Sequence, residues 1–199
     1  GASAGAAVGC LRAAGRSARE IETLALDLQP WGLARVAVGA SERLSGSGLA
    51  ELMREQARHR LLQDLPIPMV CVAQRLADRS VVAFNRGDLG LAVQASAAIE
   101  GQFAPVRIHG QRHADADLVM PLPVRVARAL GATRVLAVDA SAHEDLAPPG
   151  TERWRPGDLR KRALTRPDAD SADVLLHPEF GYYTGFSREY RERCIAAGH

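Results

Sequence analysis

The first five residues, Gly1-Ala2-Ser3-Ala4-Gly5, match the pattern Gly-x-Ser-x-Gly, and an apolar helical run over Ala6–Ala14 follows at once. This pattern is typical of a sharp strand-to-helix turn, where small residues flank the serine because glycine tolerates dihedral angles that a Cβ forbids. The amides and the positive dipole end of the helix would then face any negative charge that forms beside Ser3. An ordinary helix start, in a chain rich in Gly and Ala, is the alternative interpretation.

Helical and strand patterns alternate along the 199 residues. Their order predicts one layered α/β domain over residues 1–199 with a largely parallel central sheet, because strands that alternate with helices form parallel pairs. The helices are expected from a capping box at residues 17–20 to residue 28, and at residues 49–62, 88–99, 122–130 and 187–197. The strands are expected at residues 69–73, 80–84, 106–108, 134–138 and 174–176, with a turn at Gly110-Gln111 after the third.

Residues 29–66 look different from the rest of the chain. A break at Pro30-Trp31-Gly32 and a Gly/Ser-rich stretch at residues 39–48 precede the charged amphipathic helix expected at residues 49–62. The segment is therefore interpreted as a mobile cap more than as central core. Its apolar side chains could touch lipid or pack beneath the cap; they are Trp31, Leu33, Val36 and Val38.

Composition excludes several classes of protein. The 25 basic and 23 acidic residues nearly balance, so nothing indicates a nucleic-acid binder. Cys10, Cys71 and Cys194 are far apart and lie in apolar or helical contexts, which indicates buried or incidental thiols instead of a disulfide framework or a metal site. No run approaches the ~18 apolar residues of a membrane-spanning helix. We expect a cytoplasmic protein, although the chain opens without Met and a secretion signal is not tested.

Two more segments accompany the first motif. Residues 113–124 read HADADLVMPLPV, before a helical pattern and the strand that ends at Asp139, and residues 95–106 read ASAAIEGQFAPV. Together with Gly1–Gly5 and the ending Ala172 to Tyr182, they resemble the bacterial patatin-like phospholipases. In that family the Gly-x-Ser-x-Gly serine pairs with the aspartate of an Asp-Gly-Gly or Asp-Gly-Ala motif.

The resemblance implies a Ser-Asp dyad on a three-layer α/β/α, lysophospholipase-like sandwich that hydrolyses acyl esters of lipids through an acyl-serine intermediate. Ser3 would be the nucleophile, Asp115 the general base and the backbone N–H of Ala4 an oxyanion donor. A serine hydroxyl needs a base within hydrogen-bond reach, and a carboxylate must be partly desolvated to act as one. The implied partners are a lipid or acyl-ester substrate and a peripheral membrane surface. No metal or organic cofactor is implied.

The chain departs from the family pattern in three places. Ala116-Asp117 stands where the family has two small residues, and Glu100 stands where it usually has proline. In the family, a strand and a Gly-rich loop precede the sharp turn that carries the serine, called the nucleophile elbow, and the loop supplies oxyanion amides. They do not precede Gly1 in this sequence. A non-catalytic protein of the same fold that binds lipid or a protein partner is therefore the main alternative.

Other residues have structural interpretations beside functional ones. His113 could complete a triad but is more simply structural, and His177 is the one histidine placed for a conventional Ser-His-Asp order. Asp139 ends a strand, where ligands often bind, but such an aspartate more often caps the next loop. The arginines of residues 153–166 are interpreted as a solvated loop that could attract anionic headgroups. Acyl-chain preference, headgroup and oligomeric state stay open.

Overall fold

The computed structural model describes residues 1–29, 33, 35–36, 44–179, 181–183 and 187–199. The described chain forms two compact units, residues 1–119 and residues 120–199. The secondary structure is mixed α/β in both units, as the sequence predicts. None of the helices within these ranges has the length and apolar character needed to cross a bilayer.

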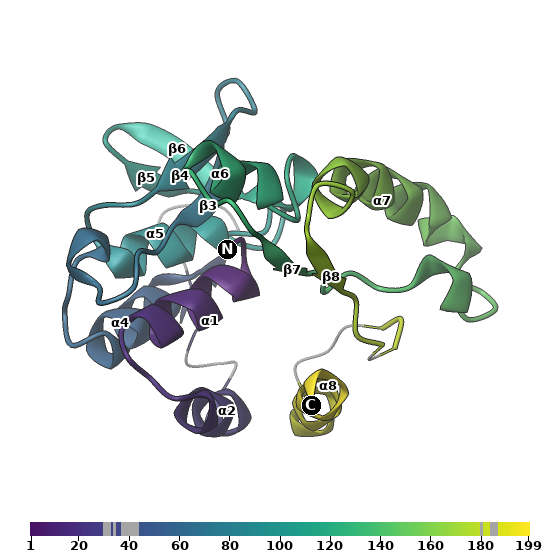
Figure 1. The fold of residues 1–199 in the computed structure, drawn as a ribbon, viewed down its shortest axis with the longest axis horizontal. Coiled ribbons are helices and arrows are strands. Elements are labelled where there is room, and N and C mark those ends of the chain that lie inside the picture. The colour runs from purple at the N-terminus through teal and green to yellow at the C-terminus, as the bar shows by residue number, and fades with distance from the viewer. Residues whose placement is uncertain (30–32, 34, 37–43, 180, 184–186) are drawn as a thin grey trace. The chain divides into compact units, whose positions relative to one another are not determined.

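A four-stranded sheet with the order β4-β3-β6-β5 forms the first unit's framework (Figure 1). Its strands are β3 (Cys71–Arg75), β4 (Val81–Phe84), β5 (Val106–Ile108) and β6 (Gln111–Asp115). Every neighbouring pair in this sheet is antiparallel. The prediction of a largely parallel central sheet is therefore wrong for these four strands.

A short connection explains the antiparallel pairing of β5 with β6. β5 and β6 are joined by His109 and Gly110 alone, at φ 48° and 76°, and such a two-residue turn closes only an antiparallel hairpin. Parallel pairing among the described residues is confined to β7 with β8 and to isolated bridges that join Ala2 to Val72 and Leu44 to Phe103.

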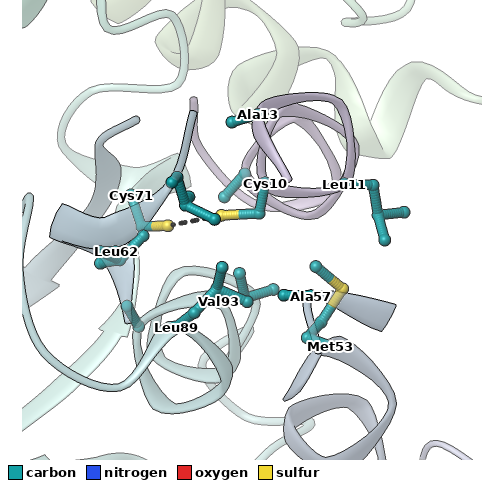
Figure 2. Packing of buried hydrophobic residues seen from close by; sticks show 12 residues of the cluster. Cys10, Leu11, Ala13, Met53, Ala57, Leu62, Cys71, Leu89 and Val93 are labelled. Carbon is teal, nitrogen blue, oxygen red and sulfur yellow. Dashed lines mark hydrogen bonds between the residues drawn. The ribbon is translucent and has the colours of Figure 1, made fainter. Parts of the chain in front are cut away.

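Three helices pack together with this sheet, namely α1 (Ala4–Ala13), α4 (Ser47–Gln56) and α5 (Leu89–Ser96) (Figure 1). Gly90 permits the close approach of α4 and α5, because a Cβ there would lie 2.4 Å from the carbonyl oxygen of Ala50. Figure 2 shows the apolar core that these elements share with β3. Its buried side chains include Cys10, Leu11, Met53, Leu62, Cys71, Leu89 and Val93.

Side-chain caps fix where several helices begin. Helix α2 (Ala18–Asp27) opens with the predicted capping box, in which Ser17 and Glu20 exchange side-chain and backbone hydrogen bonds. The Asp88 carboxylate accepts from the Leu91 amide at 2.8 Å and starts α5, as predicted. These caps are local in sequence, which is why the sequence predicts them.

Part of the predicted cap over residues 29–66 belongs to the core. Met53 of α4 and Leu62 of the 3₁₀ helix Leu62–Asp64 are both buried. Arg58 and His59, at φ 54° and 56°, end the helical stretch earlier than residue 62. The short strands β1 (Arg35–Val36) and β2 (Leu44–Ser45) pair antiparallel. Residues 30–32, 34 and 37–43, including Trp31 and Val38, lie outside the described residues.

The second unit contains a two-stranded parallel sheet and three helices within its described part. The sheet pairs β7 (Leu136–Val138) with β8 (Val174–Leu176), and in β7 Ala137 is buried while Leu136 and Val138 are exposed. The helices are α6 (Val124–Ala129), α7 (Arg155–Ala169) and α8 (Arg188–Gly198).

The prediction of a solvated loop at residues 153–166 is wrong. Residues 152–154 form a 3₁₀ turn, and α7 (Arg155–Ala169) continues from it. Pro156 lies in the first turn, where its missing N–H is not needed, and the Leu, Arg, Lys and Ala residues that follow favour a helix.

Candidate active site

Ser3 occupies a strained backbone conformation at the start of α1. Its φ of 50° and ψ of −126° lie outside the regions that residues with a Cβ commonly adopt, and such a conformation costs on the order of 1–3 kcal/mol. The residue is partly exposed. A serine strained at a strand-to-helix turn is the arrangement that the Gly1–Gly5 pattern predicts.

Residues 1 and 2 run alongside β3 and lead into this turn. The Gly1 amino group donates to the Val70 carbonyl at 2.8 Å, and the Val72 amide donates to the Gly1 carbonyl at 2.9 Å. Ala2 and Val72 form a parallel bridge. The chain therefore reaches Ser3 as an extended segment paired in parallel with a buried strand.

Asp115 lies at the end of β6, where Ala73 of β3 is its register partner. The Asp115 amide donates to the Ala98 carbonyl at 2.9 Å, just beyond α5, and the side chain is only 4% exposed. One carboxylate oxygen, Oδ1, accepts from the Asp117 amide at 3.0 Å. Asp115 is thus held by a strand on one side and by the segment just after a helix on the other.

The register on β3 places the segment that leads into Ser3 and the strand that ends in Asp115 along the same edge. Strand β4 occupies one edge of β3 along residues 71–74, so Ala2 and Asp115 both pair with the opposite edge. Their partners there, Val72 and Ala73, are consecutive residues. The segment that ends in Ser3 runs parallel to β3, whereas β6 runs antiparallel to it. The ends of these two segments therefore approach each other along this edge of β3.

The departures from the family pattern at residues 116 and 117 are accommodated locally. Asp115 caps the 3₁₀ helix Ala116–Leu118, and Ala116 is fully buried with a negative φ, so no glycine is required there. The Asp117 amide contributes a hydrogen bond to the Asp115 carboxylate. A backbone N–H that donates to a carboxylate stabilises its charged form.

Glu100, which replaces the family's proline, has polar partners. Its carboxylate accepts from the amide of Gln74 at 2.6 Å and from the guanidinium of Arg79. The Gln74 side chain is fully buried, and a buried amide without a partner would be costly. Glu100 therefore has a structural role at the end of β3.

His113 is buried in β6 and shares the sheet face of Asp115, because residues two apart in a strand point the same way. Its ring packs edge-on against Phe84 with centroids 5.1 Å apart, and its Nδ1 has no hydrogen-bond partner among the described residues. Burial lowers the pKa of His113 below its ordinary value. A neutral imidazole packed against an aromatic ring fits the structural interpretation.

The amides around Ser3 differ in their availability. Ala4 is the first residue of α1, so its amide has no acceptor within the helix and remains a candidate oxyanion donor. The amide of Ser3 itself donates to the hydroxyl of Ser96 at 2.9 Å. Ser96 lies within the ASAAIEGQFAPV segment, yet the sequence alone assigns it no role, because nothing in a strand-helix pattern shows which residue meets the elbow.

The remaining candidate residues, Asp139 and His177, lie in the second unit, and each makes local contacts there. Asp139 accepts from the Ser141 amide at 2.9 Å, which is the capping role expected of it. His177 stacks on His143 with ring centroids 3.7 Å apart, and its Nε2 lies 2.9 Å from the carbonyl oxygen of Ser141. These contacts give His177 a local role within its own unit.

Comparisons with known proteins show the family to which the chain belongs. Residues 1–128 match the family described as patatin-like phospholipase. Proteins named uncharacterized NTE family proteins, from Mycobacterium bovis and from two strains of Mycobacterium tuberculosis, are 32% identical over 162 residues, which cover 77% of this chain. A serine elbow on a mixed α/β unit defines the class, and the chain belongs to the patatin-like phospholipase family. It spans about 45% of the length of these relatives.

Proposed function

We propose that this protein is a serine acyl hydrolase that cleaves acyl esters of lipids, with Ser3 as nucleophile and Asp115 as general base. One observation carries the proposal: the segment that ends in a strained serine and the strand that ends in a buried aspartate pair with consecutive residues, Val72 and Ala73, on the same edge of β3. The family match supports a lipid substrate. We also propose the three-layer α/β/α arrangement of the family, which the parallel pairing of residues 1 and 2 with β3 supports.

The reaction has two halves. Asp115 accepts the hydroxyl proton of Ser3 while the serine oxygen bonds to the ester carbonyl carbon, and the protonated carboxyl then donates that proton to the leaving alcohol. This leaves the acyl group on Ser3. In the second half, Asp115 takes a proton from water, the water oxygen attacks the acyl-serine, and the serine oxygen leaves with the proton.

The negative charge on the carbonyl oxygen requires donors that point at it before the reaction begins. The Ala4 amide, at the positive end of α1, is the donor that this chain offers. One oxyanion donor is worth about 2.7–4 kcal/mol in other serine hydrolases. No metal or organic cofactor takes part in the proposed steps.

The main alternative is a non-catalytic member of the family that binds lipid or a protein partner. The second carboxylate, Asp117, two residues from the base, favours it, because like charges close together disturb each other's ionisation. The experiment below separates the two functions.

The test measures hydrolysis of a short-chain nitrophenyl ester by protein expressed from the complete reading frame, with covalent labelling by a fluorophosphonate as a second readout. We expect Ser3→Ala and Asp115→Asn each to lower kcat by about 10³-fold or more, because removing a nucleophile or its base disables the whole unit. The label should map to Ser3.

Asp117→Asn and His113→Ala are the matched controls, since both lie within two residues of Asp115 and outside the proposed dyad. Each should retain most of the activity. Labelling that survives Ser3→Ala, or a loss in His113→Ala equal to that in Asp115→Asn, would show that the dyad is wrong. An intact, folded protein that neither hydrolyses the ester nor takes the label supports the non-catalytic alternative.

A further inference from the structure

Ser96 is the last residue of α5 and is completely buried. Its hydroxyl makes two hydrogen bonds to different parts of the chain. It donates to the Val72 carbonyl of β3 at 2.6 Å and accepts from the Ser3 amide at 2.9 Å. A hydroxyl is one of the few small side-chain groups that donate and accept at the same time.

This hydroxyl lies where the parallel ladder reaches the elbow. The Val72 amide donates to the Gly1 carbonyl, so in a regular parallel ladder the next bond would run from the Ser3 amide to the Val72 carbonyl. The Ser96 hydroxyl joins these same two groups and lengthens the connection by one oxygen atom. The chain can therefore turn away from β3 at Ser3, the residue whose φ of 50° marks the turn, while both backbone groups stay satisfied.

The same end of α5 also holds the second candidate residue. The Ala98 carbonyl, two residues beyond Ser96, accepts from the Asp115 amide at 2.9 Å. Residues 96–98 thus hold the backbone of Ser3 and the backbone of Asp115 through one short, buried segment. Movement of either residue relative to the other would break one of these bonds.

We propose that Ser96 is a positioning residue that fixes the Ser3 elbow against β3 and in register with Asp115. This inference rests on the proposed function for its catalytic consequence. Because the Ser3 amide is taken by Ser96, it is directed away from the reacting carbonyl. The Ala4 amide is then the donor that α1 presents to the oxyanion.

The first test replaces the hydroxyl in Ser96→Ala and, at nearly unchanged volume, in Ser96→Cys. A reactive group displaced by about 1 Å loses on the order of 100-fold in rate, so we expect kcat and the rate of fluorophosphonate labelling to fall by about that factor. KM should change by less than about 3-fold, because the substrate pocket is not altered. Ser96→Thr keeps the hydroxyl and should restore most of the lost rate.

Val93→Ala is the matched control, since Val93 is equally buried in α5 and its apolar side chain has no hydrogen-bonding group. It should lower thermal stability without a comparable fall in kcat measured well below the melting temperature. If Ser96→Ala and Ser96→Cys also lose only stability and keep kcat, the positioning role is wrong.

A second readout does not depend on catalysis. The exchange rate of the Ser3 amide proton should rise by about 10-fold or more in Ser96→Ala and Ser96→Cys, and not in Val93→Ala, because the variants lose its acceptor. Unchanged exchange overturns the inference even if the wild type is active. Faster exchange in a protein whose wild type shows no hydrolysis and no labelling keeps the positioning role and rejects the proposed function.

Discussion

The thiols of Cys10 and Cys71 lie 3.5 Å apart in the core of the first unit, between α1 and β3 (Figure 2). Both residues are free cysteines with no exposed surface, as the sequence indicates for buried thiols. The hydrogen bond with Cys71 and burial together raise the pKa of Cys10. The helix that begins after Ser3 is therefore fixed to β3 about two turns further on by sulfur packing.

The two buried thiols should not react with a thiol reagent in the folded protein. Only the thiolate is nucleophilic, and a buried Cys10 with a raised pKa does not form one near neutral pH. The hydrogen bond with Cys10 lowers the pKa of Cys71, so Cys71 is protected instead by its complete burial, which keeps the reagent out. Cys194 is half-exposed and should react first. Mass spectrometry after a pulse of N-ethylmaleimide at pH 7.5 checks this, with urea-unfolded protein as the fully labelled control. Modification of Cys10 or Cys71 in folded protein, as fast as that of Cys194, would contradict the buried pair.

The N-terminal cap of α5 also forms an ion pair. Arg54 of α4 donates to both carboxylate oxygens of Asp88, at 3.1 and 2.9 Å. Replacing Asp88 with Ala removes the N-cap and this ion pair, and should lower the free energy of unfolding by about 1–2 kcal/mol. Urea denaturation measures the change. Arg75→Ala removes the exposed pair with Asp78 and should lower the free energy of unfolding by less, because water screens an exposed ion pair.

The Asp88 contribution should also depend on pH. Burial opposes its ionisation, but the Arg54 guanidinium and the Leu91 amide outweigh burial and lower the pKa of Asp88. The stabilisation is therefore present above the unfolded-state pKa of about 3.9 and is lost as pH falls through the lower folded value. The difference in unfolding free energy between wild type and Asp88→Ala should shrink below pH 4. A difference that stays constant down to pH 2 would exclude this account.

Caps of this kind show why parts of the fold could be predicted. Ser17 and Asp88 act within three residues of themselves, and the Gly1–Gly5 turn is equally local, so a single sequence reveals all three. Strand direction is set by contacts between distant segments, which is why the antiparallel order of β3 and β6 was not predicted. Ser96 was missed for the same reason, since its two partners, Val72 and Ser3, lie 24 and 93 residues away.

Stability should fall on mild acidification because of His113. Burial lowers its pKa, so the unfolded chain takes up a proton at a higher pH than the folded one does. The stability that the neutral ring contributes is present above about pH 6.5 and is lost as pH falls toward the folded pKa. In His113→Phe this part of the pH dependence should disappear, because phenylalanine keeps an aromatic ring beside Phe84 and does not titrate.

Thermal unfolding between pH 5 and 8 measures the effect. His59→Asn is the control, since His59 is exposed and asparagine tolerates its positive φ of 56°. His59→Asn should leave the change of thermal stability with pH as it is in the wild type. If the pH dependence of thermal stability persists in His113→Phe and vanishes in His59→Asn, the attribution to His113 is wrong.

The two glycines of the first motif should respond differently to substitution. A Cβ on Gly1 would lie 2.4 Å from the Gly5 carbonyl oxygen and 2.9 Å from the Ala6 nitrogen, both backbone atoms of the first helical turn. A Cβ on Gly5 meets nothing within 4 Å. Gly1→Ala must therefore push α1 away from the segment beside β3, whereas Gly5→Ala fills open space in a helix that alanine favours.

Gly1→Ala should lower the free energy of unfolding by about 1–3 kcal/mol, because the added methyl group would press on backbone atoms, which cannot rotate aside as a side chain can. If Ser3 is the nucleophile, the displaced elbow should also lose about 100-fold in fluorophosphonate labelling. Gly5→Ala should raise stability by up to about 1 kcal/mol and keep the labelling rate. Urea denaturation and labelling of the two variants side by side check both statements. Equal effects of the two substitutions would mean that the helix does not approach Gly1 as closely as this packing requires.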